Sequence, residues 1–88
     1  MNFELAYDLE IKVDREVVFV MTNDRHRKVR LLITEITETH DHIAFTGNSL
    51  GSSYPRIKAA KKDETPVVVK GDMKRSADHW SGQLTMVK

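Results

Sequence analysis

Two clusters of cationic and aromatic side chains are the residues of this chain best suited to binding chemistry. Lysine and arginine neutralise phosphate groups, and an aromatic ring stacks on a nucleobase with about 1–3 kcal/mol per base. The clusters therefore predict a site for single-stranded DNA or RNA. The predicted contact residues are Arg25, His26, Arg27, Lys28 and Arg30 in the first cluster, and Lys74, Arg75, His79 and Trp80 in the second.

The other residues that could carry chemistry are less well placed. His40-Asp41-His42 brings two imidazoles together, but no third or fourth ligand lies nearby in the sequence, so this segment is interpreted as a solvated turn. The chain has no cysteine, and its serines fall in predicted loops without a recognisable nucleophile setting. We therefore expect no metal site, no cofactor, no catalytic residue and no enzymatic activity.

The two clusters lie mainly in predicted loops between β-strands, with Arg30 on the strand that follows the first loop and Lys74 just before the second loop. Residues 3–13 alternate between apolar and mostly polar side chains, as in a half-buried strand. Residues 14–16 interrupt this pattern and residues 17–21 resume it, which fits either one long bent strand or two strands with a tight turn. Residues 22–28 form the first basic loop, because Asn23 and Asp24 favour a turn there.

The remaining elements complete a predominantly β chain. Strands are predicted at residues 29–38, 42–46, 66–74 and 83–87, with loops at 47–53 and 75–82 and one short helix at 54–62. A shift of the apolar phase within 29–38 predicts a bulge, and Gly71 predicts a second bulge or bend. Trp80 is interpreted either as a stacking platform or as a core residue at the end of a barrel. The predicted core is Val17, Phe19, Leu31, Ile33, Ile43, Phe45, Val67, Val69, Leu84 and Met86.

This order of elements is typical of the five-stranded Greek-key barrel of oligonucleotide/oligosaccharide-binding (OB) domains. The segment 66–88 resembles the closing hairpin of OB domains of the tRNA-anticodon type, through Val68, Val69 and Gly71 in one strand and Gln83 and Leu84 in the next. The usual Asp-x-[Ser/Thr]-Gly turn of that family is replaced here by residues 38–42. The resemblance implies an all-β, OB-like barrel with one short helix. A small SH3- or Sm-like barrel is the alternative.

Composition limits the possible classes. Eighty-eight residues form a single domain over residues 1–88, and a net charge of +1 argues against a strongly basic nucleic-acid binder. Residues 1–24 nevertheless hold six acids and two bases, so the rest of the chain is basic. The absence of cysteine, of a secretion signal and of a long apolar run predicts a cytoplasmic protein that does not enter a membrane.

Two functions follow as hypotheses. The first is a non-catalytic module that binds single-stranded nucleic acid weakly through its two basic loops. The alternative is an interaction, inhibitor or adaptor module in which residues 3–13 form an exposed edge strand. Such an edge would pair with a protein partner or with a second copy of the chain.

Overall fold

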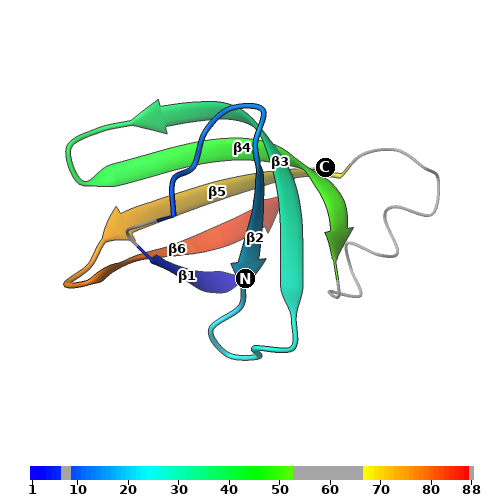
Figure 1. Cartoon of the computed structure of the whole chain (residues 1–88), viewed down its shortest axis with the longest axis horizontal. Helices are drawn as coiled ribbons and strands as arrows, with labels where there is room; N and C mark the ends of the chain where they lie inside the picture. Colours follow the sequence, from blue (N-terminus) through cyan, green and yellow to red (C-terminus); the bar gives the residue numbers. More distant parts are fainter. Residues whose placement is uncertain (7–8, 53–66, 88) are drawn as a thin grey trace.

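Six antiparallel strands form one sheet that curls into a nearly closed barrel (Figure 1). The computed structural model describes residues 1–6, 9–52 and 67–87. The strands pair in the order β1-β6-β5-β4-β3-β2, and an isolated bridge between Phe3 and Met21 brings β1 beside β2. The prediction of a small all-β barrel is confirmed. The strands are β1 (Asn2–Ala6), β2 (Glu16–Val20), β3 (Lys28–Glu38), β4 (His42–Ser52), β5 (Val68–Arg75) and β6 (His79–Met86).

The predicted strand count and strand order are wrong. The described residues hold six strands rather than five, because the N-terminal pattern forms two separate strands, β1 and β2. From β3 to β6 each strand pairs with the strand before it in the chain, and β1 closes the ring beside β6. A Greek key would instead return its fourth strand to lie beside its first. The barrel is thus of the up-and-down kind, and the predicted helix at 54–62 lies outside the described residues.

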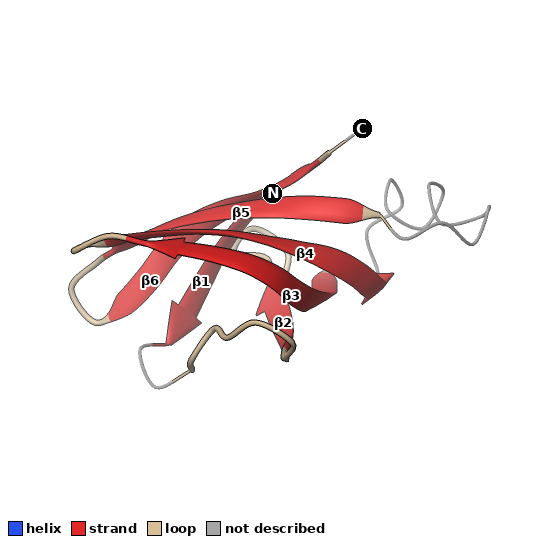
Figure 2. Cartoon of the chain, turned by 90° about the horizontal axis from the view of Figure 1, so that it is seen from above, coloured by secondary structure: helices blue, strands red, loops and turns tan. Residues whose placement is uncertain are grey.

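The strands are strongly staggered around the barrel. Starting at Phe3 and moving from each residue to its registered partner on the next strand, through β6, β5 and β4, one arrives on β3 at Glu38. In the other direction, Phe3 is bridged to Met21, whose N–H donates a hydrogen bond to the carbonyl of Arg27, the residue just before β3. Arg27 and Glu38 are 11 residues apart in the chain. Strand tilt accompanies such a stagger, and in Figure 2 the long strands β3 and β4 cross over β1 and β2.

Three phenylalanine rings pack together in the interior of the barrel. Phe3 meets Phe19 edge-on with 4.7 Å between ring centroids, and Phe19 stacks on Phe45 at 5.3 Å. Both arrangements are favourable for aromatic pairs. Met86 is only partly buried and packs against the same core. The other predicted core residues are all buried, namely Val17, Phe19, Leu31, Ile33, Ile43, Phe45, Val67, Val69 and Leu84.

Two predicted boundaries are corrected by strand pairing. β1 ends at Ala6, which lies opposite His79 at the start of β6, so the alternating residues beyond it have no partner in β6. Leu9 and Val13 are accordingly 53% and 47% exposed. In contrast, the predicted loop at 47–53 is strand as far as Ser52, because β3 supplies partners for β4 as far as this residue.

The predicted bulge in the strand at 29–38 is confirmed. The β3–β4 register shifts between Arg30 and Leu31 and again between Ile33 and Glu35. Gly71, however, lies in an unbroken register with both neighbouring strands, so the bulge predicted there is wrong. Its role is steric, since the Phe45 ring occupies the space where a β-carbon of residue 71 would lie.

The described part of the chain contains no helix with the length and apolar character that a membrane crossing requires.

A candidate nucleic-acid interface

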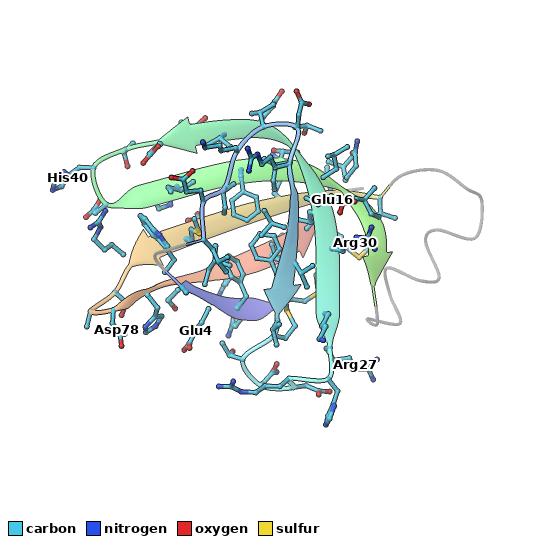
Figure 3. All side chains as sticks on the ribbon, viewed as in Figure 1. Glu4, Glu16, Arg27, Arg30, His40 and Asp78 are labelled. Atoms are coloured by element: carbon cyan, nitrogen blue, oxygen red, sulfur yellow. The ribbon has the colours of Figure 1, made fainter. Side chains whose placement is uncertain are left out.

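The first cationic cluster lies on the β2–β3 hairpin, whose loop is held together by Asp24. The Asp24 carboxylate accepts hydrogen bonds from the His26 backbone N–H at 3.1 Å and from Arg27 Nε at 3.4 Å. The Asp24 carbonyl accepts a third from the Arg27 backbone N–H at 2.9 Å. In Figure 3 Arg27 projects from the end of this hairpin. One carboxylate therefore organises a short loop that also presents the exposed Arg25.

Lys28 and Arg30 continue the cluster along β3. Their side chains alternate with buried Val29 and Leu31, so both lie on the outer face of the barrel. Arg30 Nη2 is 3.0 Å from Glu16 Oε1 on the adjacent strand β2, and the two side chains lie together in Figure 3. An exposed pair of this kind contributes at most about 1 kcal/mol to stability, so it does not fix Arg30 firmly.

The second cluster is more strand-like than predicted. Lys74 and Arg75 end β5, His79 and Trp80 begin β6, and only residues 76–78 lie between the two strands. Trp80 is 8% exposed and belongs to the core. The Arg75 guanidinium lies over its ring, 5.2 Å from the ring centroid. These positions favour the interpretation of Trp80 as a core residue at the barrel end, and the stacking role stays a prediction.

Residues from the two clusters meet in one groove. Arg25 of the β2–β3 loop and His79 of β6 both line a depression of about 350 Å³. Thr22 and Glu4 lie in the same depression, where Thr22 N–H donates a hydrogen bond of 3.0 Å to the Asn2 carbonyl of β1. The stagger of the barrel explains this proximity, because it carries the β2–β3 loop alongside β1 and so toward β6.

His79 lies between two carboxylates in this depression. Its Nδ1 donates a hydrogen bond of 2.7 Å to Asp78 Oδ1, and its Nε2 is 3.7 Å from Glu4 Oε1. Glu4 and Asp78 lie near each other in Figure 3. The hydrogen bond to Asp78 raises the pKa of His79 above its ordinary value, and the charge of Glu4 adds to the rise. The same hydrogen bond lowers the pKa of Asp78.

We expect Asp78→Asn to lower the pKa of His79 toward the ordinary value of about 6.5. The contribution of His79 to folding stability is present below its unfolded-state pKa and is lost as pH rises through the raised folded-state pKa. The contribution of Asp78 is present above its unfolded-state pKa and is lost as pH falls through its lowered folded-state pKa. An NMR titration of the His79 ring protons measures the shift directly. Asp41→Asn, an exposed substitution in the β3–β4 turn, is the matched control, and equal His79 pKa values in both variants would contradict the assignment.

Two further depressions extend this groove across the outer face of the sheet. The larger, of about 520 Å³, shares Glu4 and Thr22 with the first and is lined in addition by Asn2, Phe3, Asp72, Lys74, Ser81, Gly82 and Gln83. The next, of about 460 Å³, shares Asp72 and Gln83 and reaches Glu35 on β3. The three depressions adjoin one another through these shared residues, from the β2–β3 loop over β1, β6, β5 and β4 to β3, and together we call them the outer groove.

The sequence analysis missed several residues of the outer groove. Lys70, Asp72, Ser81 and Gln83 line it, yet only Lys74 of the predicted contacts lies beside them. The signal was present in the period-two alternation of β5 and β6, where these polar residues alternate with buried Val69, Met73 and Leu84. It was overlooked because the clusters were sought in loops rather than on a strand face.

The two histidines at residues 40 and 42 do not line the depressions themselves. His40 is exposed at the tip of the β3–β4 turn, as Figure 3 shows, whereas His42, at the start of β4, is hydrogen-bonded through its Nε2 to Asp72 Oδ1 on β5. Within residues 1–6, 9–52 and 67–87, no group of three or more His, Cys, Asp or Glu side chains is placed to hold a metal ion.

Comparison with known proteins adds no family to these observations, because no family model, curated protein or solved structure matches the chain. The resemblance of residues 66–88 to OB domains therefore stays a prediction.

Proposed function

We propose that this domain binds single-stranded nucleic acid, DNA or RNA, along the outer groove. The observation that carries the proposal is the succession of three adjoining depressions, with Arg25 and His79 at one end and Lys74 and Lys70 farther along. A groove that follows the backbone of a single strand and bears separated cations is the common feature of proteins that bind such strands. The proposal involves no catalytic step.

The charge of the outer groove indicates modest affinity. Its cations Arg25, Lys70 and Lys74 alternate with four acids, Glu4, Glu35, Asp72 and Asp78. Each phosphate neutralised by Lys or Arg releases counterions, so few such contacts give weak binding that depends on salt. The β2–β3 hairpin also carries His26, Arg27, Lys28 and Arg30, which would widen the field attracting an anionic strand.

We expect Arg25→Gln and Lys74→Gln each to flatten the plot of log affinity against log salt by about 0.7 for a single strand, because each removes one phosphate contact. Fluorescence anisotropy with a short labelled oligonucleotide at several salt concentrations measures the slope. Lys12→Gln is the matched control, since Lys12 lies on the β1–β2 connection in an ion pair of 3.0 Å with Glu10.

The control should keep the parental slope. Equal slopes for the parent and for both groove variants would show that Arg25 and Lys74 do not meet phosphates. Failure of every oligonucleotide to bind, even at low salt, would reject the proposed function.

One observation favours a protein partner as the second candidate. β1 and β2 share a single bridge, whereas every other neighbouring pair of described strands forms a ladder of at least five residue pairs. Val18, in the middle of β2, is 47% exposed. Beyond the bridge, the edge of β2 offers a place for an extended segment to pair. Such pairing would be nearly insensitive to salt, which distinguishes it from nucleic-acid binding.

A further inference from the structure

We propose that Asp72 selects bases that carry an amino group, so that the outer groove prefers cytosine to uracil at its centre. This inference rests on the proposed function and adds base preference to it. Asp72 lines both of the larger depressions, together with Gln83, which faces it across the β5–β6 ladder. The Asp72 side chain is 64% exposed, and a strand lying in the groove would reach it.

The position of Asp72 is set by its neighbours on three strands. His42 on β4 binds its Oδ1, Gln83 on β6 is its registered partner, and Asn2 on β1 is the registered partner of Gln83. A carboxylate held by a histidine thus lies beside two carboxamides on the outer face of the barrel.

Cations flank this carboxylate along β5. Lys70 and Lys74 lie two residues before and two residues after Asp72, and all three are exposed on the same face of the strand. With a rise of about 3.3 Å per residue, the two lysine positions are roughly 13 Å apart. Phosphates would be held at the two lysines, which leaves the base between them opposite Asp72.

The chemistry of the carboxylate decides which bases it accepts. An ionised carboxylate only accepts hydrogen bonds. Cytosine presents its exocyclic N4 amino group as a donor with two hydrogens. Uracil has a single donor on that edge, N3–H, which lies between two carbonyl oxygens, so a carboxylate that accepts from it also meets an acceptor. Gln83 and Asn2 can donate or accept, so they tolerate either base, and the discrimination comes from Asp72.

The test compares oligo(dC) with oligo(dU), which differ on this edge of the base and are otherwise closely matched in size and charge. Labelled strands of about 12 nucleotides, within the site sizes found for small barrels, are titrated by anisotropy at low salt and slightly alkaline pH. We expect the parent to bind oligo(dC) roughly tenfold more tightly, the size of one hydrogen bond to a charged group. Asp72→Asn should bring the ratio close to one, because an amide both donates and accepts.

Asp41→Asn controls for the loss of one negative charge, since it makes the same substitution at an exposed turn residue that lines none of the three depressions. It should keep the parental ratio of affinities. Equal binding of the two oligonucleotides by the parent, or the same ratio in the parent and in Asp72→Asn, would overturn the base preference while leaving nucleic-acid binding intact. If neither oligonucleotide binds, the proposed function itself fails.

Discussion

Replacing Phe45 with alanine is expected to cost about 3–5 kcal/mol of unfolding free energy. The Phe45 ring stacks on Phe19 with an interplanar angle of 7° and meets Phe3 edge-on at 6.3 Å. Truncation therefore leaves a cavity in the interior and removes two aromatic contacts at once. A small domain has about 5–15 kcal/mol of stability in total, so a large part of the Phe45→Ala population should unfold under mild conditions.

Urea unfolding followed by the fluorescence of Trp80, the single tryptophan of the chain, measures this loss. Trp80 lies in the same core, so its emission changes when the barrel opens. Val18→Ala is the control, because Val18 lies on the outer face of β2 and its truncation should cost within about 0.5 kcal/mol. A Phe45→Ala protein with the parental unfolding midpoint would show that β4 does not deliver this ring to the core.

The second large effect is expected for Gly71→Ala. The Phe45 ring covers the backbone of Gly71, so an added β-carbon would overlap the ring and force Phe45 out of its stack on Phe19. Overpacking of a core costs typically 1–3 kcal/mol, and the absence of free space here places Gly71→Ala at the upper end of that range. Thermal or urea unfolding again gives the loss directly.

The Phe45→Leu background separates this steric cause from a general intolerance of alanine. Leucine shortens the side chain opposite residue 71, so adding Gly71→Ala should cost much less there than in the parent. The two substitutions should therefore be strongly non-additive, with a coupling of about 1 kcal/mol or more. Additive losses would mean that Gly71 is needed for its backbone and not for the space above it.

Much of the fold could be predicted because period-two alternation reports directly which side chains face the interior. The buried residues of β2, β3 and the first half of β4 follow from that rule, and the phase shift in β3 revealed its bulge. Alternation does not reveal where a partner strand ends. Leu9 and Val13 continue the pattern of β1 but lie beyond its last pair, Ala6 with His79.

The order of the strands could not be predicted either, because alternation along one strand does not reveal which strand pairs with it. The pairing of Asn2 with Gln83 joins residues at opposite ends of the chain, and no local signal encodes it. For the same reason, the sequence did not predict which residues of the candidate site lie close together. Arg25 and His79 were both predicted as contacts, but their meeting in one depression depends on the stagger of the barrel. Asp72 was missed because a single acid between two lysines resembles an ordinary solvated strand face.

The pairing of β1 with β6 also determines the order in which the barrel can form. β2 to β6 pair with their neighbours in sequence, whereas the ladder of β1 requires His79–Met86 to be in place. Contacts between residues so far apart carry a large loop-closure entropy and slow folding. Of the six described strands, β1 is therefore synthesised first and paired last. Until it docks, β2 and β6 both present open edges, and the unfinished barrel is most exposed to association with other chains at that stage.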